Sequence, residues 1–284
     1  MPGLEIAGAV EAVAPDVTGL RPGQRVAIEP VVTCSRCAAC RRGRYNCCAE
    51  LRLLGVHLPG RLAELVAVPA ERAHPLPDDL SPQLGALVEP FSIGAQAVER
   101  AQVAADDTVV LLGAGVIGLT VLPLARSRGA RVLVVEPNPG RRTLALELGA
   151  EAACTEPANA AGPVVAEFTA GEGASVVEAT GQPEAMAATT ALAAPAGRIA
   201  IVGVTSQPVP FAALEILRKE LDHFGVRNSR DRYPEVVDFV AANRPLAERL
   251  ISRTFGFSDV VDAFAYVDTA EATILRAVMA GMRV

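Results

Sequence analysis

The chain has 284 residues, of which 51% are hydrophobic and 4% aromatic, and its formal net charge is -6. This length favours two domains with an aliphatic core. The acidic balance argues against a nucleic-acid partner, because no broad basic face offsets phosphate charge. The first residues lack the basic start and apolar core of a signal peptide, so we expect a cytoplasmic protein. Six cysteines in that compartment are more typical of metal ligands or reduced thiols than of disulfides.

The N-terminal part reads as short β-strands. Residues 4–31 alternate short apolar runs with glycine and proline, which is the pattern of barrel strands. We expect an all-β segment, because no helical period begins before about residue 82.

A cysteine cluster follows, with the spacing Cys34-x2-Cys37-x2-Cys40-x7-Cys48. Four thiolates on so short a loop can surround one tetrahedral ion, which predicts a structural zinc site. Cys47 is an alternative fourth ligand, although we favour Cys48. An iron–sulfur cluster is the main rival, but the bacterial ferredoxin spacing and its following proline are absent. The arginines of this loop are consistent with a nucleic-acid zinc ribbon, yet a solvated basic loop fits the acidic chain better.

The most informative stretch begins at Val109, where four apolar residues lead into Gly113, Gly115 and Gly118. This pattern predicts a strand, a tight turn and a helix that Val116 and Ile117 open. The first glycine makes the turn, the second admits a pyrophosphate and the third packs helix on strand. Residues 108–125 carry no charge and are just long enough for a membrane span. The glycines, an internal proline and the absence of flanking basic clusters favour a buried strand and helix instead.

A second strand is expected at residues 131–136, and it ends in Glu136. A carboxylate eighteen residues after Gly118 can accept both hydroxyls of the adenosine ribose and would repel a 2'-phosphate. We therefore expect NAD rather than NADP. Arg141 and Arg142 weaken this preference, because arginine there can also meet a phosphate.

The next elements alternate between strand and helix. Asn138 is expected to cap a helix that starts at Pro139 and that Gly149 ends. Further strands are expected at residues 150–155, 175–180, 198–204 and 221–226, and helices at 164–169 and 183–193. This alternation predicts a doubly wound parallel sheet whose ligand crevice lies beyond the carboxyl ends of the strands. Thr180, Gly203 and Val204 fall at such ends.

The last part changes pattern again. We expect a helix at residues 234–242, a strand at 251–255 and a helix that Ser258 caps. Asp259 would lie in the first turn of that helix, where a negative charge is favourable.

Several motifs together resemble one known family. They are Pro2-Gly-Leu-Glu-Ile-Ala-Gly-Ala-Val, Pro22-Gly-Gln-Arg-Val-Ala, the four-cysteine lobe, Gly60-Arg-Leu-Ala-Glu, Leu76-Pro-Asp, Ala86-Leu-Val-Glu-Pro, the glycine turn, Glu178-Ala-Thr-Gly, Gly197-Arg-Ile-Ala-Ile-Val-Gly and Lys219-Glu-Leu. The chain resembles the zinc-dependent medium-chain alcohol dehydrogenases, in the polyol and sugar-acid branch related to sorbitol dehydrogenase. The resemblance implies a GroES-like β-barrel domain at residues 1–96 with the zinc lobe at 34–48, a Rossmann domain at 97–230, and a return to the first domain at 231–284.

The resemblance also implies where coenzyme and partners bind. Gly203 and Val204 belong to a stretch that lies beside the nicotinamide in the family, and Arg227 approaches coenzyme or substrate. Thr180 lies at the same edge of the sheet. The family implies a small-molecule polyol, sugar or sugar-acid substrate, no membrane, and a homo-oligomer that forms through the last Rossmann strand.

One departure from the family concerns the reaction centre. The family motif Pro-Gly-His-Glu supplies a histidine ligand for a catalytic zinc, whereas this chain has Leu4, and the family's first cysteine ligand lies upstream of residue 1. Only Glu5 and Glu89 remain, and Glu89 also reads as an ordinary solvated residue of an amphipathic helix. Leucine cannot coordinate and two carboxylates hold zinc poorly. We therefore expect an NAD-dependent dehydrogenase of secondary alcohols with an impaired catalytic zinc site; an inert NAD-binding relative or fragment is the alternative.

Overall fold

The computed structural model describes residues 2–60, 62–269 and 275–280, and the chain divides into two compact units. Unit 1 comprises Met1–Ser92 and Asn228–Val284, and unit 2 comprises Ile93–Arg227. The chain thus leaves the first unit, builds the second and returns.

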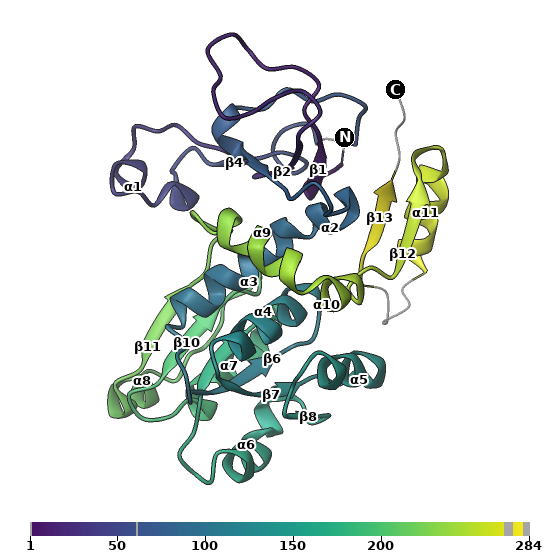
Figure 1. Cartoon of the computed structure of the whole chain (residues 1–284). Helices are drawn as coiled ribbons and strands as arrows, with labels where there is room; N and C mark the ends of the chain where they lie inside the picture. The colour runs from purple at the N-terminus through teal and green to yellow at the C-terminus, as the bar shows by residue number, and fades with distance from the viewer. Residues whose placement is uncertain (1, 61, 270–274, 281–284) are drawn as a thin grey trace. The chain divides into compact units, whose positions relative to one another are not determined.

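Unit 2 is built around a parallel six-stranded sheet in the order β11-β10-β9-β6-β7-β8 (Figure 1). The strands are β6 (Thr108–Leu112), β7 (Arg131–Val135), β8 (Ala152–Cys154), β9 (Ser175–Glu178), β10 (Arg198–Ile201) and β11 (Asp222–Gly225). This is the strand order of dinucleotide-binding domains. The chain adds strands outward on one side of β6 and then, from β9 onward, on the other side. The predicted doubly wound sheet is confirmed. Strands β7 to β11 are shorter than the sequence indicates, whereas β6 begins one residue earlier, at Thr108.

Helices connect these strands. They are α3 (Val88–Arg100), which crosses from unit 1, and α4 (Val116–Ser127), α5 (Pro139–Glu147), α6 (Gly162–Phe168), α7 (Pro183–Leu192) and α8 (Ala213–Lys219), with a 3-10 turn η3 (Ala158–Ala160). Asn138 caps α5 by accepting a hydrogen bond from the N–H of Arg141 at 2.9 Å, as its position predicts. Gly149 follows the helix with a φ of 100°. Within the described residues, no helix has both the length and the apolarity that a membrane crossing needs.

Unit 1 contains three small sheets among the described residues. The first is antiparallel, in the order β1 (Ile6–Ala9), β2 (Arg25–Ile28) and β5 (Ala73–Pro75). The second pairs β3 (Val31–Val32) with β4 (Arg52–Leu53), and the third pairs β12 (Arg253–Gly256) with β13 (Ala277–Ala280). Its described helices are α1 (Ala38–Arg41), α2 (Pro82–Ala86), the start of α3, α9 (Tyr233–Ala242), α10 (Arg244–Glu248) and α11 (Val260–Asp268). Its core includes Leu80, Leu87, Phe91 and Tyr233, all fully or almost fully buried.

Two local expectations are wrong. The segment before residue 82 is not all-β: it contains a four-residue helix α1 (Ala38–Arg41) and the 3-10 turns η1 (Tyr45–Cys47) and η2 (Ala70–Arg72). These turns are too short to produce a helical hydrophobic period. Ser258 does not cap α11, because it lies in the 3-10 turn η4 (Phe257–Asp259) and its hydroxyl bonds to Asp259 instead.

Candidate functional site

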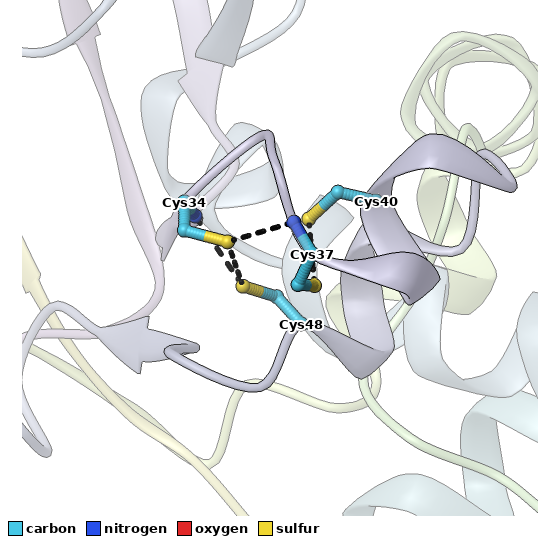
Figure 2. A group of neighbouring side chains, drawn as sticks. All are labelled: Cys34, Cys37, Cys40 and Cys48. Carbon is cyan, nitrogen blue, oxygen red and sulfur yellow. Dashed lines mark hydrogen bonds between the residues drawn. The ribbon is translucent and has the colours of Figure 1, made fainter.

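The four cysteines converge in the lobe between β3 and β4 (Figure 2). Their sulfur atoms all lie within 4.8 Å of one another. The Sγ atoms of Cys37 and Cys40 are 3.5 Å apart, and those of Cys48 and Cys34 are 3.4 Å apart. These separations suit four sulfurs arranged around one ion with zinc–sulfur bonds of about 2.3 Å. The residues therefore fit a four-sulfur zinc site.

Backbone N–H groups point at these sulfurs. The N–H of Cys37 donates to Cys34 Sγ at 3.4 Å, and the N–H groups of Cys34 and Glu50 each donate to Cys48 Sγ at 3.3 Å. Such donors stabilise thiolates, so the N–H of Ala49 and other donors lower the pKa of Cys37 to about 6. Cys47 is exposed and does not belong to the cluster, which leaves Cys48 as the fourth member.

Two carboxylates of unit 1 form the second candidate region. Glu89 is 7% exposed in the first turn of α3, and burial, with the Glu5 charge adding to it, raises its pKa to about 8. Glu5 forms an ion pair with Arg276, which precedes β13. Burial raises the pKa of Glu5 despite that partner. The sequence analysis missed Arg276, because one arginine in a C-terminal segment carries no pattern.

These carboxylates do not make a catalytic zinc site in the described residues. The cysteine cluster is the only group of three or more histidine, cysteine, aspartate or glutamate side chains there that could hold an ion. Leu4 cannot coordinate, and Glu5 is already paired with a cation. The residues present thus fit a structural zinc and do not fit a catalytic one, which needs three protein ligands and an open position.

The glycine turn of unit 2 has the geometry that its spacing predicts. Gly113 has a φ of 94°, and a Cβ on Gly118 would lie 2.0 Å from the carbonyl oxygen of Gly113. An added Cβ on Gly115 would meet nothing within 4 Å, so open space lies in front of the backbone that starts α4. The half-buried Val116 and Ile117 are the first residues of that helix, whose free N–H groups can receive phosphate oxygens.

Glu136 ties this turn to the next one. Its Oε2 accepts the N–H of Ala114 at 2.8 Å, and its Oε1 accepts the N–H of Asn138 at 2.9 Å. Each carboxylate oxygen retains a further lone pair for a hydroxyl donor. The Nη1 of Arg142 donates to the carbonyl oxygens of Glu136 and Pro137 at 2.9 and 2.7 Å, which ties one side of its guanidinium to the backbone. Arg141 is half-buried beside it.

The remaining predicted coenzyme residues lie at the carboxyl ends of the strands. Thr180 is half-buried after β9, Val204 is 91% exposed after β10, and Arg227 is exposed after β11. Gly203 and Val204 line a largely apolar pocket of about 370 Å³ with residues of β10, β11 and the loop between them. Thr180 and Arg227 do not line this pocket.

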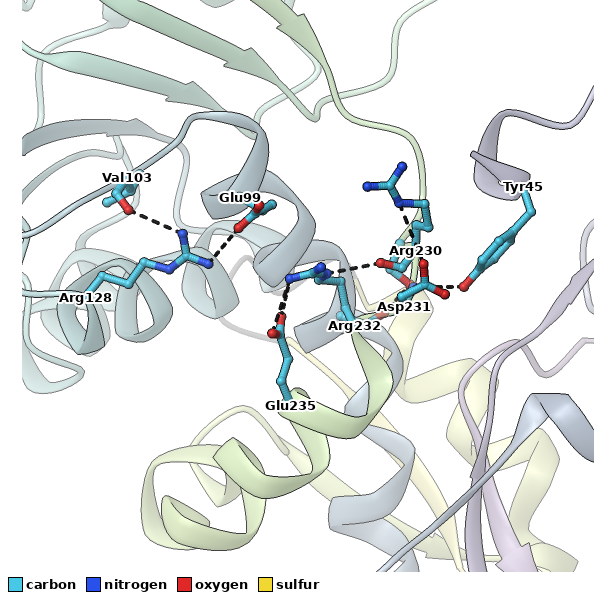
Figure 3. A network of polar contacts seen from close by, with 10 residues as sticks. Tyr45, Glu99, Val103, Arg128, Arg230, Asp231, Arg232 and Glu235 are labelled. Carbon is cyan, nitrogen blue, oxygen red and sulfur yellow. Dashed lines mark hydrogen bonds and ion pairs between the residues drawn. The ribbon is translucent and has the colours of Figure 1, made fainter. Parts of the chain in front are cut away.

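A buried polar network in unit 1 escaped the sequence analysis. Glu29, 3% exposed, accepts hydrogen bonds from Arg72 at 2.6 Å and from the Tyr45 hydroxyl at 3.0 Å. The Tyr45 hydroxyl also accepts the N–H of Asp231 at 2.9 Å (Figure 3). Burial alone would raise the pKa of Glu29, but His74, Arg72 and Tyr45 outweigh it and lower that pKa. The network fastens the cysteine lobe to β2 and to the segment before α9.

Comparisons with known proteins agree with this fold. Residues 1–78 match the alcohol dehydrogenase GroES-like domain, and residues 116–242 match the zinc-binding dehydrogenase domain. L-galactonate-5-dehydrogenase of Escherichia coli is 33% identical over 92% of this chain and 77% of its own length. Sorbitol dehydrogenase of Bacillus subtilis is 31% identical over 92% and 75%. The crystal structure of the E. coli alcohol dehydrogenase RspB, complexed with NADH, has a TM-score of 0.90 and 32% identity, covering 99% of this chain and 83% of that one.

Proposed function

Because the chain belongs to the zinc-dependent medium-chain alcohol dehydrogenases, we propose that it oxidises a secondary hydroxyl of a polyol, sugar or sugar acid with NAD. The names of the galactonate and sorbitol relatives support this substrate class. The observation that carries the proposal is the glycine turn at Gly113–Gly118 with Glu136 bound to its backbone. That arrangement offers phosphate donors and a ribose acceptor on adjacent strands.

Residues of unit 2 hold the coenzyme in this proposal. The N–H groups at Val116, Ile117 and Gly118 meet the pyrophosphate, and Glu136 accepts the ribose hydroxyls. Arg142 is committed to carbonyl oxygens, which favours NAD over NADP. Thr180, Gly203, Val204 and Arg227 contribute to the nicotinamide side, and Arg141 borders the adenosine ribose. Bound NAD supplies the hydride acceptor.

We assign zinc to the Cys34, Cys37, Cys40 and Cys48 cluster, where it orders the lobe. We assign the reaction centre to Glu5 and Glu89 and derive no step through a second zinc. Oxidation of an alcohol releases a hydride and the hydroxyl proton, and the Glu89 carboxylate is suited to accept that proton, because its pKa lies near 8. Arg276 forms an ion pair with Glu5, whose charge helps to raise the pKa of Glu89. Without a Lewis acid to stabilise the alkoxide, turnover should be slow.

Two measurements test this function. Purified protein should contain about one zinc per chain, rather than the total of two expected if a catalytic site were also filled. NAD reduction over a panel of polyols and sugar acids should be slow and should fall further in Glu89→Gln. NADH binding without turnover on any substrate would favour the inert relative, which Leu4 supports. Absence of NADH binding would refute both functions.

We also propose that the chain forms a homodimer in the cytoplasm. The edge strand β11 has one neighbour in the described sheet, and Val204, Leu214 and Leu217 near it are 91%, 57% and 77% exposed. Such an unpaired edge with apolar surroundings favours pairing with a second copy. None of the six cysteines forms a disulfide, which suits a reducing compartment. Light scattering should give twice the chain mass, and Leu217→Glu should give a monomer; a wild-type monomer would refute the pairing.

A further inference from the structure

The carboxyl group of Glu178 is completely buried at the end of β9. This strand lies beside β6, at the point where the order of the strands along the chain reverses. In the register of the sheet, Glu178 lies opposite Leu112 of β6 and Ile201 of β10. Burying a carboxyl group in an apolar sheet is costly unless it is hydrogen-bonded. The hydrogen-bond partners of the Glu178 carboxyl group therefore indicate its role.

One oxygen of Glu178 holds the turn that follows β9. Oε1 accepts the N–H of Thr180 at 2.6 Å, the N–H of Gly181 at 3.0 Å and the hydroxyl proton of Thr180. The Thr180 hydroxyl in turn accepts the N–H of Gln182 at 2.9 Å. The hydroxyl proton and the N–H of Thr180 are thus both committed to Glu178 within the protein.

The other oxygen faces the turn that follows β10. A Cβ on Gly203 would lie 2.4 Å from Glu178 Oε2 and 2.2 Å from the Gly181 nitrogen. The N–H groups of Val202 and Gly203 donate to the backbone carbonyl of Glu178 at 2.9 and 3.1 Å. Glu178 therefore contacts the second turn with both its backbone and its side chain.

The first glycine turn completes this wall. A Cβ on Gly113 would lie 2.8 Å from the methyl carbon of Thr180, and the N–H of Ala179 donates to the Leu112 carbonyl at 2.9 Å. The turns after β6, β9 and β10 thus close against one another around Glu178. These are the turns that carry Gly113, Thr180 and Gly203.

We propose that Glu178 is a positioning residue for the nicotinamide coenzyme: its carboxyl group fixes the turns after β9 and β10 directly and, through Thr180, the turn after β6, and these three turns form the coenzyme wall. This inference rests on the proposed function. The length of the side chain, rather than its charge, carries the role, because Oε1 must reach two backbone N–H groups while the other branch fills the space under Gly203. Burial raises the pKa of Glu178, while the hydrogen bonds from Thr180, Gly181 and Gly203 act in the opposite direction.

The test compares three variants by NADH fluorescence titration. Glu178→Gln retains length and an acceptor oxygen, so its Kd for NADH should stay within about twofold of wild type. Glu178→Asp retains charge but is one methylene shorter, and Glu178→Ala removes the carboxyl group; both should weaken binding about tenfold or more, as expected when two or more hydrogen bonds that the carboxyl oxygen accepts are lost. If Glu178→Ala does not fold, the contrast between Gln and Asp still decides.

A matched control separates positioning from general loss of stability. Val165 lies 3% exposed in α6, and it belongs to the core of unit 2 without contributing to the three turns. Val165→Ala should lower the Tm while leaving the Kd for NADH unchanged. Glu178→Asp binding like wild type, or Glu178→Gln losing as much as Asp, would overturn the inference. Failure of the wild-type protein to bind NADH would instead refute the proposed function.

Discussion

Removing the hydroxyl group of Tyr45 should destabilise the attachment of the cysteine lobe to the rest of unit 1. In Tyr45→Phe the ring remains, and so does its stacking under the Arg72 guanidinium, which lies 4.5 Å from the ring centroid. The change deletes the bond to buried Glu29 and the bond from the N–H of Asp231. A hydrogen bond to a charged group contributes about 1.5–3 kcal/mol, and the exposed Asp231 N–H can bond to water instead. We therefore expect the free energy of unfolding to fall by about 2–3 kcal/mol.

Urea unfolding followed by circular dichroism, with zinc present, measures this loss. The chain offers a matched control in Tyr266, whose hydroxyl makes no hydrogen bond to the described residues. Its ring packs on Phe255, with the two ring centroids 5.6 Å apart. Tyr266→Phe should stay within about 0.5 kcal/mol of wild type. Equal stability of Tyr45→Phe and wild type would refute the reasoning that this hydroxyl fastens the lobe.

Four further outcomes are expected. Cys34→Ser should lose its zinc by elemental analysis, whereas Cys47→Ser should keep it; equal metal contents would contradict the ligand assignment. Glu136→Gln should weaken NADH binding about tenfold in fluorescence titrations and raise relative affinity for NADPH, because a charged acceptor becomes neutral. The raised pKa of Glu89 means that its contribution to stability is present below pH 4.5 and is lost up to about pH 8, by at most about 1.4 kcal/mol for each pH unit. Glu89→Gln should flatten that slope in urea unfolding, and an unchanged slope would place the titration elsewhere. For Glu29 the pH dependence of stability has the opposite sign. Its lowered pKa contributes stability that is present above pH 4.5 and is lost as the carboxylate is protonated in acid, so in Glu29→Gln the free energy of unfolding should no longer show this decrease at acid pH.

Local patterns in the sequence sufficed for the parts of the protein that are contiguous in the chain. The glycine turn, the cap at Asn138 and the strand that ends in Glu136 each depend on a few neighbouring residues, whose steric and hydrogen-bonding needs leave few alternatives. The cysteine spacing likewise predicts the cluster, because so short a loop must bring its thiols together. Glu178 carries the same signal as Glu136, a carboxylate at the end of an apolar run, and could have been found that way.

Contacts between distant segments were decided only by the tertiary structure. Glu5 pairs with Arg276, and Tyr45 with the backbone of Asp231, but nothing in the local sequence patterns predicts either pairing. Which of the many charged groups meet depends on how the strands and returning helices pack, and a buried charge is tolerated only where such packing supplies a partner. The sequence therefore determined the glycine turn and the cysteine lobe, whereas the fold selected the partners that hold them, because close approach across the chain is set by packing rather than by spacing.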